Sequence, residues 1–156
     1  MKRISIVLLL VVGAVALAAS DPKADVANVL RSNARAFEQH DMQTLDRLWS
    51  HGDDVTVFEN GHANYGWIDY RDHHLKPEVE DMKNVKYELT DIRTRVSSKT
   101  AWSTFKYTIS AEYHEQKIDG SGLGTAVLEK ASGGWKIVHW HTSAPRKKPA
   151  EAPAPK

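Results

Sequence analysis

The chain has 156 residues, carries 21 basic and 20 acidic residues for a formal net charge of +1, and contains no cysteine. The missing cysteine excludes disulfides, thiolate metal sites and iron–sulfur clusters. Outside a basic start and a tail with four basic residues and one acid, residues 21–144 hold 15 basic against 19 acidic residues. With this excess of acidic residues, the domain is not expected to have the basic face of a nucleic-acid binder, so no nucleic-acid partner is expected.

Residues 1–20 have the pattern of a secretory signal peptide. A basic pair follows the first methionine, an apolar run comes next, and the motif Ala16-x-Ala18 ends the segment with small side chains. The apolar run is shorter than the roughly 20 residues of a membrane-spanning helix, which favours cleavage over anchoring. The pattern predicts a secreted or periplasmic protein that is cut near Ser20 and has no membrane association afterwards.

Two helices are expected next. Residues 21–41 show apolar side chains at helical spacing, with Asp21 as a cap and Pro22 in the first turn. Residues 41–50 predict a short second helix with Asp41 as its N-cap.

A strand and a third helical segment follow. Residues 53–60 are rich in β-branched side chains and end in a turn signal, Asn60-Gly61. Residues 66–82 read as helical again, and Pro77 is expected to break or restart that helix.

Beyond this point the pattern changes to strand-like alternation. Hairpin turns are expected around Ser97-Ser98, at Asp119-Gly120 and over 132–134. Helices followed by an antiparallel meander are typical of an α+β domain, in which one curved sheet wraps the long first helix. The expected strands span 85–97, 100–116, 120–132 and 133–143.

Three stretches carry a resemblance to a known family: AFEQHDMQTLDRLWSHGDDVTVFE, GWIDYRDHHL and GGWKIVHWHTS. With the strands between them they resemble the nuclear-transport-factor-2-like (NTF2-like) superfamily, and within it the SnoaL-like and ketosteroid-isomerase-like small domains. The resemblance spans Asp25–Ser143. It implies an NTF2-like cone over 21–144, with N-terminal helices packed on a curved, mostly antiparallel sheet, followed by a disordered tail rich in Pro, Ala and Lys at 145–156.

The resemblance also implies a pocket between the concave face of the sheet and the helices, and a homodimer formed through the other face of the sheet. The superfamily includes isomerases, dehydratases, cyclases and binding domains. The fold therefore leaves the activity open.

The closing strand holds two histidines one residue apart. Alternation puts His139 and His141 on the same face as Trp135 and Ile137. Because those two residues are large and apolar, this face is expected to be the concave one, with the imidazoles about 7 Å apart along the strand. His139 and His141 are therefore candidate ligand-binding residues and candidate general acids or bases. The alternative is a buried, hydrogen-bonded His139 and a partly exposed His141 at the rim.

Further candidates lie upstream. Helical spacing places Trp67, Tyr70 and His74 in one stripe, so His74 is favoured over His73 to face the pocket. Glu59 ends the first strand and is either a pocket carboxylate or an exposed acid. In the ketosteroid-isomerase-like enzymes that the chain resembles, a pocket acid is the general base. The complete acid-plus-tyrosine set of that family is not found at matching positions here.

No cofactor or metal is expected, although His74, His139 and His141 together would suit Zn²⁺ or Cu²⁺. Three functions stay open. In the first, the chain is an exported domain that binds a small, partly apolar molecule in a pocket lined by histidine and aromatic residues. Alternatively, it is an enzyme of the isomerase, cyclase or dehydratase type that uses a pocket histidine as general acid or base. The third alternative is a structural, dimer-forming domain with an inert pocket.

Overall fold

The computed structural model describes residues 21–145, so the predicted signal peptide and nearly all of the predicted tail lie outside the described part. The predicted α+β class is confirmed: helices pack against one six-stranded, mostly antiparallel sheet. In residues 21–145, no helix is long and apolar enough to cross a membrane. The helical segments are α1 (Pro22–Glu38), α2 (Met42–Leu48), α3 (Trp67–Tyr70), a π-helical segment (Arg71–Leu75) and α4 (Lys76–Asp81). The strands are β1 (Thr56–Glu59), β2 (His62–Tyr65), β3 (Met82–Ser97), β4 (Thr100–Tyr113), β5 (Gln116–Ala131) and β6 (Gly134–Ser143).

The first two helices begin at their expected caps. The Asp21 side chain accepts the backbone N–H of Lys23 at 3.0 Å, and Pro22 occupies the first turn of α1. Asp41 Oδ1 accepts the Thr44 N–H at 2.9 Å. These caps fix where each helix starts, and α1 then buries one face on the sheet. The buried residues of that face are Val26, Leu30, Asn33, Ala34, Ala36 and Phe37.

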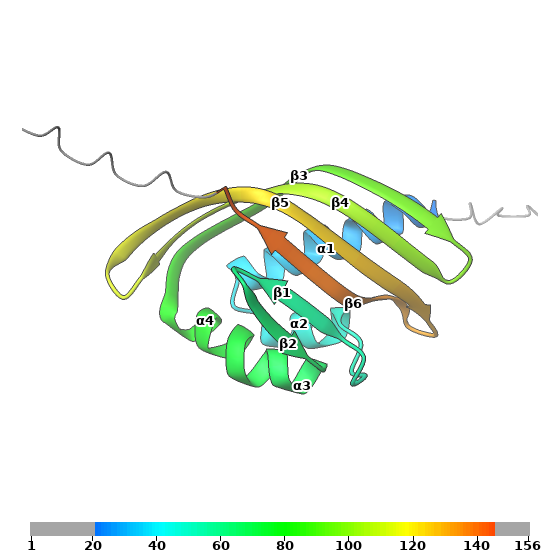
Figure 1. The fold of residues 1–156 in the computed structure, drawn as a ribbon, viewed down its shortest axis with the longest axis horizontal. Helices are drawn as coiled ribbons and strands as arrows, with labels where there is room; N and C mark the ends of the chain where they lie inside the picture. The colour runs from blue at the N-terminus through cyan, green and yellow to red at the C-terminus, as the bar shows by residue number, and fades with distance from the viewer. Residues whose placement is uncertain (1–20, 146–156) are drawn as a thin grey trace, which may run out of the picture.

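The sheet has the strand order β2-β1-β6-β5-β4-β3, in which only the β1–β6 pair is parallel. Figure 1 shows β3, β4 and β5 bending in the same direction, with α3 and α4 on the side toward which they curve. Two register shifts in β3, between Lys83 and Lys86 and between Thr90 and Arg93, accompany this bend. The concave face of the sheet and the helices together enclose the core.

The predicted helical segment over 66–82 is present, but the break expected at Pro77 does not occur. The residues at the segment boundaries have right-handed helical backbone angles, so α3, the π-helical segment and α4 follow one another without a gap. Pro77 lies in the first turn of α4, directly after the π-helical segment.

One strand and one turn differ from expectation. The Asn60-Gly61 turn has positive φ at both residues, 51° and 83°, and it folds the chain back into β2. The polar, mostly exposed sequence of β2 gave no strand signal. The expected turn at Asp119-Gly120 is wrong, because both residues lie inside β5 and pair with β4. The β4–β5 turn instead lies at 114–115, where both residues have positive φ.

A β-bulge in β6 decides which side chains face the core. His139 and Ile137 pair with consecutive residues of β5, so Val138 is an extra residue between them. Ile137 faces the core before the bulge and Trp140, 2% exposed, faces it afterwards. His139 and His141 consequently lie on the outer face. The predicted concave placement of these two histidines is wrong, because it assumed unbroken alternation through the strand.

Candidate functional site

A cavity of about 370 Å³ lies between the concave face of the sheet and helices α1, α2, α3 and α4. Its wall is mostly aromatic and aliphatic, and its volume is in the range of small-molecule sites. The aromatic lining residues are Phe37, Trp49, Tyr70, Tyr87, Tyr107, Tyr113 and Trp140, and the polar ones are Asn33, Glu59, Asn60, Glu78 and Thr142.

Glu59 is the buried carboxyl group of this cavity. It follows Val57 on the inward face of β1, and its side chain is 15% exposed. Burial, and secondarily the neighbouring carboxylate of Glu78, raise the pKa of Glu59 to about 7. The charge of the nearby His74 counters part of this rise, followed by hydrogen bonds from Thr142, whose Oγ1 lies 3.5 Å from Glu59 Oε1, and from Tyr70. Glu59 can therefore gain or lose a proton near neutral pH.

His74 links the two carboxyl groups at the edge of the cavity. Its Nε2 lies 3.3 Å from Glu78 Oε1 and 3.8 Å from Glu59 Oε2, and the side chain is 18% exposed. The hydrogen bond to Glu78 raises the pKa of His74, against the opposing effect of burial. A protonated His74 therefore pairs most closely with Glu78 and only more distantly with Glu59.

Asn64 fixes the orientation of the His74 ring. Its Nδ2 donates to Asp69 Oδ2 at 2.9 Å, so its Oδ1 faces His74 Nδ1 at 2.8 Å and can only accept. His74 Nδ1 must then carry a proton, which leaves Nε2 as the atom that exchanges protons with the two glutamates. The β2 strand, which supplies Asn64, is thus part of the site.

The structure brings three of the predicted site residues together. Glu59 and Tyr70 line the cavity, and His74 contacts Glu59 at its edge. Trp67 does not line it: this side chain, 1% exposed, stacks on Trp49 with ring centroids 5.3 Å apart. The expected ligand contact of Trp67 is therefore corrected to a role in the core.

His139 and His141 lie behind the cavity wall, on the outer face of the sheet. The Thr56 hydroxyl lies 2.7 Å from His139 Nδ1, and the Phe58 ring contacts both imidazoles edge-on at 5.5 and 6.4 Å between centroids. Burial, together with the nearby His141, lowers the pKa of His139. These histidines belong to a surface, and neither reaches the cavity.

The same placement separates the three histidines considered for a metal. His74 lies at the cavity, and His139 and His141 face away from it across the sheet, so they cannot share an ion. Within residues 21–145, no cluster of three or more His, Asp or Glu side chains has a metal-binding arrangement.

Sequence reasoning missed several cavity residues. Glu78 lies four residues after His74, a helical spacing that already predicts their contact. Asn33 is a polar residue in the buried stripe of α1, and its Oδ1 accepts the Trp49 indole N–H at 2.9 Å. No sequence pattern indicated that Trp140 and Thr142 line the cavity, because only the β6 bulge turns these two side chains inward.

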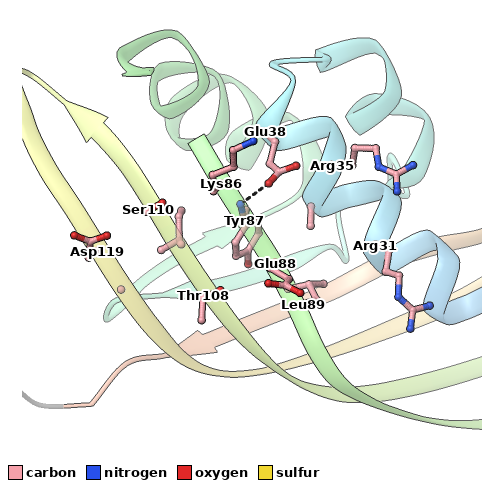
Figure 2. Close-up of a pocket in the computed structure, with 13 residues that line it drawn as sticks. Arg31, Arg35, Glu38, Lys86, Tyr87, Glu88, Leu89, Thr108, Ser110 and Asp119 are labelled. Carbon is pink, nitrogen blue, oxygen red and sulfur yellow. Dashed lines mark hydrogen bonds between the residues drawn. The ribbon is translucent and has the colours of Figure 1, made fainter. Parts of the chain in front are cut away.

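A second, larger hollow of about 560 Å³ lies between α1 and strands β3, β4 and β5. Figure 2 shows the Glu38 carboxylate on the backbone nitrogen of Tyr87, a 2.7 Å hydrogen bond, while Arg31 and Arg35 project from α1 away from Tyr87. The charged side chains that line this second hollow are balanced in number, so we take the aromatic cavity as the candidate site. The charged side chains of the hollow are Arg31, Arg35 and Lys86 against Glu38, Glu88 and Asp119.

The sequence pattern of the SnoaL-like domain family matches residues 26–147, and the chain belongs to this family. Solved structures of the NTF2-like type share its fold. One is an NTF2-like superfamily protein from Salmonella enterica serovar Typhimurium LT2, with 17% identity, a TM-score of 0.74, and coverage of 83% of this chain and 95% of that one. A search among curated proteins finds no significant match.

Two further structures are similar. A candidate dehydratase of the NTF2-like family from Streptomyces avermitilis is 19% identical, with a TM-score of 0.73 over 80% of this chain and 96% of that chain. The CaMKII hub of S. rosetta is 21% identical, with a TM-score of 0.67 over 82% of this chain and 100% of that chain. At these identities the similarity concerns the fold alone.

Proposed function

We propose that the chain is an exported domain that holds a small, partly apolar molecule in the Glu59 cavity. The observation that carries this proposal is a single buried carboxyl group set in a wall of aromatic rings. Such a wall accepts apolar groups of a ligand, and a few polar groups orient it. Glu59, Thr142 and Asn33 are the polar groups available for that purpose.

Export is the part of the proposal that rests on residues 1–20, outside the described structure. The motif that ends at Ala18 supports cleavage near Ser20. Edman or mass-spectrometric sequencing of the protein purified from its native host tests it. A purified protein that still begins at Met1 would contradict export by cleavage.

Ligand binding is tested by native mass spectrometry of the purified protein, followed by thermal unfolding with each co-purified compound. A ligand that binds only the folded state raises Tm with its concentration. We expect that rise in the wild type and its loss when Tyr113→Leu, which lines this cavity and not the second hollow, removes part of the cavity wall. Arg31→Gln, at the second hollow, is the control and should leave the rise unchanged. A rise that persists in Tyr113→Leu would place the ligand elsewhere.

Catalysis is a second candidate function, favoured by one observation. A carboxyl group with a pKa of about 7 in a mostly apolar cavity is suited to take and return a proton at neutral pH. In this alternative Glu59 is the general acid or base, in place of His139 and His141. Turnover of the co-purified ligand by the wild type, and its loss in Glu59→Gln when both are measured at saturating ligand, would support an enzyme.

The partner we propose for the outer face of the sheet is a second copy of the chain. Adjacent rows of this face hold Trp102, Val127, His139 and Tyr65 in one row and His141 and Phe58 in the next. In the described part of the chain, four of the five exposed large apolar side chains are on this face. Contiguous exposed apolar surface of this kind marks an interaction site. These four side chains are Phe58, Tyr65, Trp102 and Leu123.

A further inference from the structure

The charge of the cavity wall is one-sided. Glu59 and Glu78 are both lining residues, and in the described part of the chain no lysine or arginine lines the cavity. His74 is the nearest basic side chain, and its Nε2 is closer to Glu78, at 3.3 Å, than to Glu59, at 3.8 Å. One protonated histidine can balance only one of the two carboxylates. An ionised Glu59 is therefore left without a full counter-charge inside the protein.

Aromatic rings line the same cavity as that unbalanced carboxylate. Trp49 has its ring centroid 5.2 Å from that of Tyr70 and 6.4 Å from that of Trp140, and all three rings line the cavity. The face of an aromatic ring carries partial negative charge and attracts an alkylammonium group, most strongly where water is excluded. The rings and the carboxylate therefore favour the same kind of ligand.

We propose that the ligand of this cavity is a cation, a substituted ammonium compound with apolar groups, whose positive charge is held by Glu59 and the surrounding rings. This inference rests on the proposed function, because it names the class of molecule that the cavity binds. An anionic ligand would face two carboxylates without a basic partner, at a high desolvation cost. A neutral ligand would leave the ionised Glu59 unpaired.

Binding of a cation is coupled to the protonation of Glu59. Removing a carboxyl group from water favours its neutral form, whereas a bound cation restores the ionised form. Binding of a cation must therefore release a proton from Glu59 below about pH 7, and affinity must rise with pH up to that value. The groups that face Glu59 are Glu78 on α4, His74 on the π-helical segment, Tyr70 on α3, Tyr87 on β3, Tyr107 on β4 and Thr142 on β6.

The test compares three probes of similar shape on the full mature chain: benzyltrimethylammonium, its neutral carbon isostere neopentylbenzene, and the anion phenylacetate. Trp49 and Trp140 line the cavity, so intrinsic tryptophan fluorescence reports binding. At pH 8 we expect the cation to bind at least about tenfold more tightly than the isostere, and the anion more weakly than both. The quaternary ammonium does not titrate, so any pH dependence of its binding belongs to the protein.

Variants connect the preference to Glu59. Glu59→Gln is expected to weaken binding of the cation about tenfold and to leave binding of the isostere unchanged. The variant should also remove the pH dependence of cation binding between about pH 5.5 and 7.5. Glu80→Gln is the control, because this glutamate lies on α4 together with the cavity residue Glu78 but is 64% exposed and pairs with Lys76 at the surface. It should behave as the wild type for all three probes.

The possible outcomes separate this inference from the proposed function. Equal binding of cation and isostere, or tighter binding of the anion, would overturn the cationic class and leave a small-molecule site in place. Binding of none of the probes, together with no co-purified compound, would overturn both. A cation preference that survives in Glu59→Gln would also contradict the inference, because the charge would then be recognised elsewhere.

Discussion

Two features of Glu59 disfavour its ionised form in the free protein. Its side chain is largely removed from water, and its nearest basic partner is shared with Glu78. Thr142 and Tyr70 support its ionised form by hydrogen bonds but do not compensate for burial, so the pKa remains at about 7. At pH 8 the folded protein must hold a carboxylate that it solvates poorly. This is a stability cost that a functional group can impose on its fold.

We therefore expect Glu59→Gln to stabilise the protein at pH 8. The pKa of Glu59 rises from 4.5 to about 7 on folding, so the folded state binds more protons between these values. The stability that this uptake contributes is fully present below pH 4.5 and is lost as pH rises through 7. The shift corresponds to an upper value of roughly 3 kcal/mol. Urea unfolding at pH 5 and pH 8 should show a gain for Glu59→Gln at pH 8 that largely disappears at pH 5. A gain in unfolding free energy at pH 5 that equals or exceeds the gain at pH 8 would contradict the raised pKa of Glu59.

His139 should act on stability with the opposite sign. Its pKa is lowered on folding, first by burial and then by His141, so the unfolded chain binds more protons below its usual pKa of 6.5. Stability should then fall as pH drops below about 6.5. We expect His139→Gln to reduce this acid-dependent loss when urea unfolding is compared at pH 7.5 and 5.5. Gln keeps a polar partner for Thr56. An unchanged pH slope in the variant would show that His139 is not the group responsible.

At the scale of elements, the concave wall depends on close contact between β4, β5 and β6. Gly124 of β5 lies under the Phe105 ring, and that ring packs on Trp140 of β6 with centroids 4.8 Å apart. A Cβ at Gly124 would stand 2.2 Å from Phe105 Cε2, nearer than two carbons can approach. The absence of a side chain here therefore lets two aromatic residues of the cavity region reach their positions.

Gly124→Ala is expected to destabilise the protein by about 1–3 kcal/mol, the usual cost of overpacking a core. The displaced Phe105 ring should also disturb Trp140, which reports through its fluorescence. Gly133→Ala is the control, because nothing lies within 4 Å of an added Cβ at that turn. Thermal and urea unfolding of the two variants measure the difference. Equal stability of both would show that the β4–β5 spacing adjusts without cost.

Some of the helices and strands could be predicted from sequence patterns and others could not. Periodicity and caps predicted both N-terminal helices and the long strands, because local preferences and burial agree there. Alternation failed in β6, since one extra residue, Val138, exchanges the two faces for all that follows. It therefore predicted His139 and His141 in the cavity, where Trp140 and Thr142 lie. The β2 strand was missed for another reason: its pairing is backbone-driven and its side chains are mostly exposed.

For the whole molecule, the outer face of the sheet is the surface to explain. It carries Trp102, 44% exposed, and Phe58, 36% exposed, together with the two histidines that the bulge turns outward. We expect the chain to form a dimer in solution and Trp102→Lys to shift it to the monomer, since a buried unpaired charge opposes association. Ile68→Lys is the matched control, because Ile68 is 55% exposed but lies on α3, off this face. Sedimentation velocity over a concentration series measures the effect. A wild type that stays monomeric, or equal dissociation by both variants, would contradict this interface.

The central claim is that Glu59 is a buried cavity carboxyl group that ligand binding ionises. A pH titration of its side-chain carboxyl carbon by ¹³C NMR, assigned with Glu59→Gln, tests it most directly. We predict a midpoint at about pH 7 in the free protein and a lower midpoint in the presence of saturating benzyltrimethylammonium. A midpoint near the usual value of 4.5 that does not move with the cation would mean that Glu59 is solvated, and would contradict the account.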